Sequence, residues 1–153
     1  VPAEDYYERA GIWAEFGKIV CISVGYFVVK NGQRQFRVRS FVGEERDILK
    51  DFSYLVNQFF SGREYLLAAH NGKEFDFPFI ARRMLILGLA LPEKLQLFGK
   101  KPWELGFLDT LDLWKFGDYK HYTSLNLLAY VLGRLRTISQ GQRLGLSTTK
   151  SRI

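Results

Sequence analysis

The 153-residue chain is poor in several features, and each shortage excludes a class of protein. Its single cysteine, Cys21, cannot form a disulfide within the chain, which suits a reducing cytoplasm. No apolar run reaches the roughly 18 residues that a membrane-spanning helix needs, and no signal peptide is recognisable. We therefore expect a cytoplasmic protein with no membrane partner, in which Cys21 is a small core residue.

Acidic residues are missing from one end of the sequence. Residues 134–153 contain five basic residues and no acidic ones: Arg134, Arg136, Arg143, Lys150 and Arg152. Removing these five from the total of 22 leaves 17 basic against 16 acidic residues, so residues 1–133 carry a net charge of only +1. The nearly neutral charge of residues 1–133 is therefore weak evidence that this part of the chain binds nucleic acid.

Hydrophobic patterning predicts one α/β domain with a mixed sheet. Asn31-Gly32, the strongest short-range signal for a hairpin, separates strand-like runs at 18–29 and 33–41. The other predicted elements are helices at 44–60, 78–87 and 124–132 and strands at 65–69 and 108–114.

The stretch from His70 to Ile80 is the most informative part of the sequence. A strand-like run leads into Asn71-Gly72, and a helix follows with Pro78 at its expected first position, where a missing N–H costs nothing. Asp76 is thereby placed at the C-terminal end of a strand and at the N-terminus of a helix. Ligands bind at this end of the strands in open α/β sheets. An ordinary N-capping aspartate after a loop is the alternative interpretation.

Several separate segments resemble a bacterial family of predicted 3′–5′ exonucleases related to the proofreading domain of family B DNA polymerases. These segments are Ala14–Tyr26, Asn71–Asp76, Leu108–Lys120 and Tyr122–Leu125. The N-x-x-x-F-D pattern that ends at Asp76 is similar to the second motif of the DEDD exonucleases. The resemblance covers roughly residues 6–133 and implies a ribonuclease H-like mixed sheet flanked by helices.

The resemblance also implies an activity, which is hydrolysis of phosphodiester bonds at the 3′ end of single-stranded DNA. Two Mg²⁺ or Mn²⁺ ions held by carboxylates would support this reaction. Asp76 would be the catalytic metal ligand, and Asn71 and Phe75 would contact the nucleic acid. Asp109 and Asp112 lie in a segment that resembles the family's own, and we interpret them as structural residues.

Two of the family's metal-binding motifs are missing. No D-x-E precedes Lys18, where the first strand should be, and no Y-x-x-x-D follows Gly133. We therefore expect a form truncated at both ends, without the first strand and the last helix, and inactive as written. Loss of a central strand should leave exposed backbone groups beside Ile19–Val24, or a second copy of the chain should cover them. A catalytically dead module that binds nucleic acid or a protein is the alternative.

Residues 134–153 are interpreted as a separate tail after the domain at 1–133. If the codon frame of this segment is shifted and synonymous bases are chosen freely, the encoded residues resemble the family's own sequence after the last predicted helix. We therefore expect a frame-shifted and poorly ordered tail, and a natural basic tail that binds nucleic acid is the alternative. The sequence leaves the oligomeric state open.

Three further expectations concern the environment of particular side chains. Arg82 and Arg83 should lie on a solvated helix face, with phosphate contact as the alternative. His70 should be a structural residue. The three tryptophans and the phenylalanines should serve core and lid packing and not base stacking.

Overall fold

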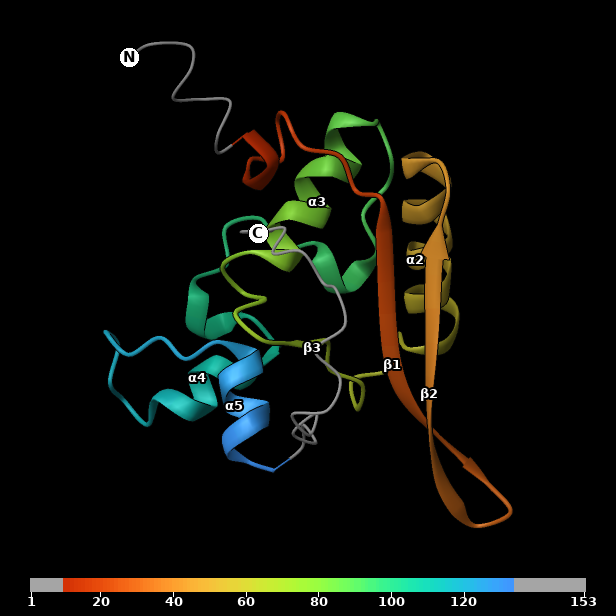
Figure 1. Cartoon of the computed structure of the whole chain (residues 1–153). Coiled ribbons are helices and arrows are strands. Elements are labelled where there is room, and N and C mark those ends of the chain that lie inside the picture. Colours follow the sequence, from red (N-terminus) through yellow and green to blue (C-terminus); the bar gives the residue numbers. More distant parts are fainter. Residues whose placement is uncertain (1–9, 134–153) are drawn as a thin grey trace, which may run out of the picture.

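The computed structural model describes residues 10–133, which form an α/β arrangement (Figure 1). Its strands are β1 (Cys21–Lys30), β2 (Gln33–Val42), β3 (Ala68–Ala69) and β4 (Leu108–Asp109). Its α-helices are α2 (Glu45–Phe59), α3 (Asp76–Ile86), α4 (Thr110–Lys115) and α5 (Leu125–Val131). Short 3-10 helices are η1 (Ala10–Ile12), η2 (Glu93–Leu95) and η3 (Pro102–Glu104). None of the helices within 10–133 is both long enough and apolar enough to cross a membrane.

Strands β1 and β2 form the predicted antiparallel hairpin. Asn31 and Gly32 both have positive φ, 52° and 74°, which is the turn geometry that matches the twist of the strands. The first strand begins at Cys21 and not at Lys18. The N–H of Ile19 donates to the carboxylate of Glu45 in α2, 26 positions away, and not to a strand.

Helix α2 covers one face of the hairpin (Figure 1). Its buried apolar side chains recur at helical spacing, as the sequence predicts: Ile48, Leu49, Phe52, Leu55 and Val56. Burying each such side chain contributes roughly 1.5–3 kcal/mol. This stripe joins Phe41 of β2 and Phe77 and Met84 of α3 in one core.

Strands β3 and β4 form a second, parallel pair that is only two residues long. One further bond, from the N–H of Leu108 to the carbonyl of Leu67 at 2.9 Å, extends the pairing. The predicted strand at 108–114 is wrong beyond Asp109, where the chain turns into α4. Asp109 causes this turn, because its carboxylate accepts a hydrogen bond from the N–H of Leu111 at 3.0 Å and caps the helix.

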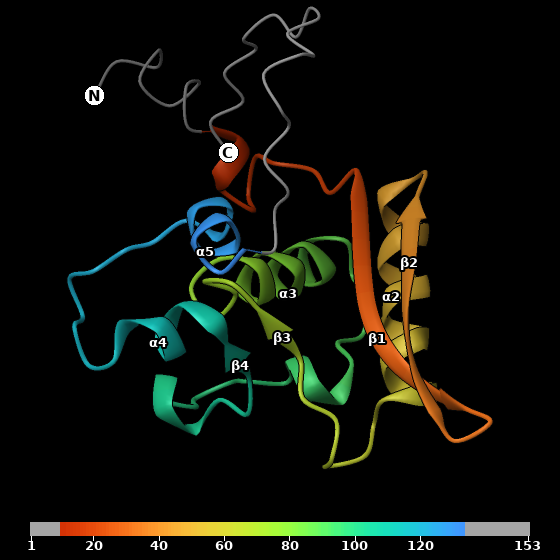
Figure 2. The ribbon, with the colours of Figure 1, turned by 60° about the horizontal axis from the view of Figure 1, so that its bottom comes forward.

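The two strand pairs do not join into one sheet within residues 10–133. In this part of the chain, β1 and β3 each have a strand neighbour on one side only. Figure 2 shows β1 and β3 as two ribbons set apart from each other. Residues of both strands line a groove of about 1340 Å³. Ile22 and Val24 of β1 are among the residues that line this groove. The expectation that a lost central strand exposes backbone groups there stays a prediction.

Several side chains lie elsewhere than predicted. Cys21 is exposed and not in the core, because alternate residues of β1 point away from α2. Trp13 and Trp103 are 54% and 76% exposed, which contradicts a role in core packing. The same prediction is wrong for Phe27 and Phe36, which are 59% and 60% exposed. Arg83 is buried and not on a solvated face, because it is paired with a carboxylate of α2, whereas Arg82 is exposed as predicted.

Candidate functional site

The site is built around the turn that follows β3. Asn71 adopts a left-handed conformation with φ of 62°, which asparagine tolerates better than most residues. Its N–H donates to Oδ1 of Asp109 at 2.8 Å, and the N–H of Lys73 donates to Oδ2 of the same carboxylate at 3.1 Å. Asp109 therefore fixes the path of the chain just before Asp76.

Asp109 is buried, and its hydrogen bonds explain how it remains charged. Burial alone would raise the pKa of this carboxyl, but hydrogen bonds from backbone amides outweigh burial and leave the pKa below its ordinary value. The amides belong to Lys73, Asn71, Leu111 and Asp112. These contacts support the interpretation of Asp109 as a structural residue.

His70 holds the other side of the same turn. Its Nε2 lies 2.7 Å from the carbonyl oxygen of Thr123, and its Nδ1 lies 2.9 Å from Oγ1 of Thr110. Because a carbonyl oxygen only accepts, Nε2 must carry a proton. His70 thus ties the end of β3 to the segment before α5, as expected of a structural histidine.

Helix α3 begins at Asp76, two residues before the predicted start at Pro78. Pro78 still lies in the first turn, where the N–H groups have no partner within the helix. The turn itself is tightly packed, since the N–H of Phe77 donates to the carbonyl of Gly72 at 3.0 Å. A side chain at Gly72 would collide with the Cβ of Ala69, so only glycine fits this position.

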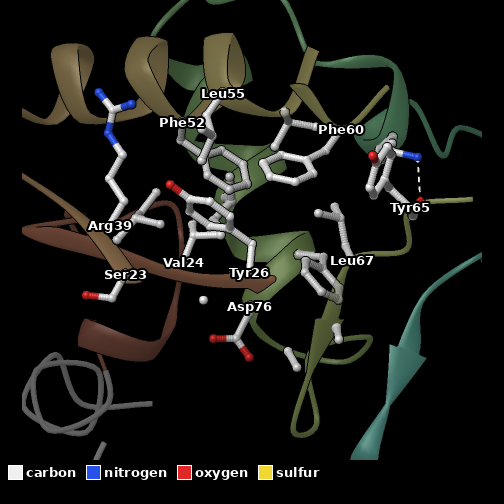
Figure 3. A pocket seen from close by; sticks show the side chains of 18 of the residues that line it. Ser23, Val24, Tyr26, Arg39, Phe52, Leu55, Phe60, Tyr65, Leu67 and Asp76 are labelled. Carbon is white, nitrogen blue, oxygen red and sulfur yellow. Dashed lines mark hydrogen bonds between the residues drawn. The ribbon is translucent and has the colours of Figure 1, made fainter. Parts of the chain in front are cut away.

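Asp76 lies beside a small cavity next to the groove. The cavity has a volume of about 370 Å³ and is lined by Ile12, His70, Asn71, Phe75, Asp76 and Tyr122. The three predicted site residues therefore lie together. Asp76 is exposed and also lines the larger groove, beneath Val24 and Tyr26 of β1 in the view of Figure 3.

The electrostatic state of Asp76 differs from that of Asp109. Partial burial raises the pKa of the Asp76 carboxyl above its ordinary value, and the nearby charge of Asp109 raises it further. A hydrogen bond to its own backbone opposes the shift. Perturbed carboxyls in clefts are frequent at functional sites, although structural networks produce them too.

The donor set around Asp76 does not fit a two-metal centre. Within residues 10–133, no three His, Cys, Asp or Glu side chains gather in a way that could hold a metal ion. Both oxygens of Asp109 are taken by backbone amides, and Asp112 is paired with Lys73 at 3.0 Å. Asp76 is thus a single exposed carboxylate, able to contribute one oxygen ligand to a centre whose other ligands come from elsewhere.

Two residues of the cavity, Ile12 and Tyr122, were not predicted from the sequence. They are far from Asp76 along the chain, and no motif spacing connects them to it. Tyr122 directly precedes Thr123, whose carbonyl binds His70, so the fold and not a local pattern brings Tyr122 to the site.

A family model described as the RNase H superfamily matches residues 7–140, and so extends past the last described residue, Gly133. Comparisons with curated proteins and with solved structures gave no match. Members of this superfamily are usually nucleases that act on nucleic acids with divalent metals. The match spans most of the sequence and agrees with the mixed α/β fold, so the chain belongs to the RNase H superfamily.

Proposed function

We propose that this domain is of the 3′–5′ exonuclease type, whose complete members act on single-stranded DNA ends, and that residues 1–153 by themselves do not cut DNA. One observation supports the proposal: Asp76 is exposed at the start of α3, and it lines one cavity together with Asn71 and Phe75. Superfamily membership supports a nuclease-type function in general, and the motif at Asn71–Asp76 supports the exonuclease type.

The side chains around the cavity suit a nucleotide at a strand end. The ring of Phe75 lies 5.6 Å from the ring of Phe79, centroid to centroid, and this contact braces Phe75 at the cavity. A braced ring provides a surface on which a base can stack. The carboxylate of Asp76 is the kind of hard oxygen ligand that Mg²⁺ and Mn²⁺ prefer.

Inactivity follows from the missing carboxylates. Two divalent ions about 3.5–4 Å apart repel each other strongly unless several negative ligands surround them. Asp76 alone cannot offset this repulsion. We therefore expect the chain to leave DNA intact under conditions in which complete exonucleases degrade it.

Single-stranded DNA labelled at its 5′ end tests the inactivity directly. The full chain incubated with Mg²⁺ or Mn²⁺ should give no ladder of shortened products. A ladder that disappears in Asp76→Ala would contradict the proposal, because it would show that the chain holds further ligands.

Calorimetric titration with Mn²⁺ tests the assignment of Asp76. Asp76→Asn keeps the shape of the side chain and removes its charge, so weak metal binding at the site should become weaker still. Asp112→Asn is the matched control, because it removes one exposed carboxylate nearby without touching the cavity. Equal binding by the wild type and Asp76→Asn would exclude Asp76 from any metal site.

The DNA that flanks the reading frame tests the exonuclease assignment itself. A longer polypeptide with an upstream D-x-E and a downstream Y-x-x-x-D should produce the ladder, and Asp76→Asn in that polypeptide should abolish it. A complete polypeptide that cuts no single-stranded DNA would remove the exonuclease assignment. The second candidate function, a catalytically dead module that binds nucleic acid or a protein, would then remain.

A further inference from the structure

The outer face of the β1–β2 hairpin is an exposed surface that the proposed function does not use. Residues paired across antiparallel strands point to the same side, so Phe27 and Phe36 share the face turned away from α2. Phe27 is 59% exposed and Phe36 is 60% exposed. The tip of the hairpin projects beyond the end of α2 (Figures 1 and 2).

The aromatic side chains on this face are held in fixed positions. The ring centroids of Phe27 and Phe36 lie 5.2 Å apart, and the guanidinium of Arg34 lies 4.8 Å from the centroid of Phe27. The Phe36 ring lies across the bare backbone of Gly25, where any side chain would collide with it. The rings of Phe27 and Phe36 and the guanidinium of Arg34 thus form one continuous surface. Beneath Phe36 this surface rests on the backbone of Gly25.

The charge of the hairpin differs sharply from that of the domain. Residues 21–42 contain four basic residues and no acidic ones: Lys30, Arg34, Arg37 and Arg39. None of these four forms a salt bridge with another residue of the described part, 10–133. By their strand register, Arg37 and Arg39 belong to the other face of the hairpin, the one turned toward α2, but both residues are exposed. All four basic residues lie on the same hairpin. Their electrostatic potentials therefore add near the rings of Phe27 and Phe36, within a Debye length of about 8–10 Å.

We propose that this face binds single-stranded nucleic acid, with bases stacked on Phe27 and Phe36 and phosphates attracted by the basic residues. Exposed aromatics interleaved with cations are the combination that single-strand-binding proteins use. A duplex does not fit, because its bases are already stacked on each other and cannot cover protein rings. A purely apolar protein partner does not fit either, because it would bring an uncompensated guanidinium, Arg34, into a dry interface.

Binding of fluorescent oligo(dT) and oligo(U) of about 12 nucleotides to the full chain, measured by anisotropy in EDTA, tests the proposal. Phe27→Leu and Phe36→Leu keep an apolar side chain and remove a ring, and each should weaken binding about tenfold. Phe98→Leu is the matched control, because Phe98 is 75% exposed and lies outside the hairpin. It should bind as the wild type does. Oligo(dT) and oligo(U) should behave alike, since stacking is indifferent to the sugar.

The salt dependence separates stacking from charge. Arg34→Gln should reduce the slope of log K against log salt by about 0.7, whereas Phe27→Leu should leave the slope unchanged. Arg63→Gln removes the same charge from an exposed position outside the hairpin and should leave the slope as it is. The basic residues at 134–153 are present in every variant, so their contribution cancels in the comparison.

Two outcomes would overturn the proposal. In one, both Phe variants bind as tightly as the wild type while their melting temperatures are unchanged. In the other, size-exclusion chromatography shows a dimer that Phe27→Leu dissociates, which would make this face an interface between copies. Asp76→Asn should bind the oligonucleotides normally, so a failure of the proposed exonuclease function leaves this test unaffected.

Discussion

Glu45 and Arg83 form a buried ion pair with two hydrogen bonds. Nε of Arg83 donates to Oε1 of Glu45 at 2.7 Å, and Nη2 donates to Oε2 at 2.6 Å. The remaining contacts extend the pair, since the N–H of Ile19 donates to Oε1 and Nη1 of Arg83 donates to the carbonyl of Ala14. Two side chains thereby join α2, α3 and the segment that leads into β1.

Arg83→Leu should strongly destabilise the domain. Removing one partner of a buried pair leaves the other charge uncompensated, which typically costs about 3–5 kcal/mol. Urea denaturation measures this loss of the free energy of unfolding. Arg82→Leu is the control, because Arg82 is the exposed neighbour on the same helix and should change stability by less than about 0.5 kcal/mol. Equal effects of the two substitutions would contradict a special role for the pair.

The Glu45–Arg83 pair should also make stability depend on acid pH. The hydrogen bonds from Arg83 hold the pKa of Glu45 below its ordinary value. The resulting stability is present above the unfolded-state pKa of about 4.3 and is lost as the pH falls through the lower folded-state value. The free energies of unfolding of the wild type and Glu45→Gln should therefore converge as the pH drops. Glu44→Gln removes an exposed carboxylate next to Glu45, and it should change the free energy of unfolding at neutral pH by less than about 1 kcal/mol.

Asp109→Ala should loosen the turn at Asn71. The substitution leaves the buried amide of Leu111 and the partly buried amides of Asn71 and Lys73 without an acceptor. An unsatisfied buried group costs roughly 1–3 kcal/mol, and a partly buried one costs less. Hydrogen exchange at the amides of Asn71 and Lys73 should accelerate, and the free energy of unfolding should fall. Asp112→Ala removes a carboxylate whose side chain is 50% exposed, so it should cost less than about 1 kcal/mol. Unchanged exchange in Asp109→Ala would show that other contacts hold the turn.

Asp76→Asn should make the domain slightly more stable at neutral pH. A raised pKa means that the folded state binds the proton more tightly than the unfolded state does. Stability therefore falls as the pH rises from the unfolded-state value of about 3.9 through the folded-state pKa. The gain should stay below about 1 kcal/mol, because solvent screens an exposed carboxylate. It should vanish in acid, and a loss of stability at neutral pH would contradict this account.

Deletion of Arg134–Ile153 should leave the melting temperature nearly unchanged, because the sequence of this segment offers few apolar residues that could anchor it to a core. The expected tail itself lies outside the described residues, and its interpretation as frame-shifted stays a prediction. Non-specific DNA retention that depends steeply on salt should decrease on deletion. A large drop in melting temperature would show that the segment is a folded element.

Local signals in the sequence predicted the elements that depend on neighbouring residues. Asn31-Gly32 specified the hairpin, because both residues tolerate positive φ. The spacing from Ile48 to Val56 specified α2. Ser124 marked the start of α5, and its hydroxyl accepts a hydrogen bond from the N–H of Leu127 at 3.3 Å.

Contacts between distant residues explain what the sequence did not predict. Arg83 is buried because Glu45 lies opposite it, 38 positions away, and no local pattern announces that pairing. The sequence at 108–114 has a strand-like pattern, but the strand ends at Asp109 because this residue caps α4. Asp76, Asn71 and Phe75 were found because one short motif contains them, whereas Tyr122 reaches their cavity only through the fold.

The free edge of β1 has a practical consequence for work with this polypeptide. A ten-residue strand whose second side has no strand neighbour within 10–133 offers a template for another chain to pair with. Native proteins usually blunt such an edge, and here an apolar groove lies beside it. Aggregation at high concentration, low yield from expression and dependence on chaperones are therefore to be expected unless an added strand fills the groove.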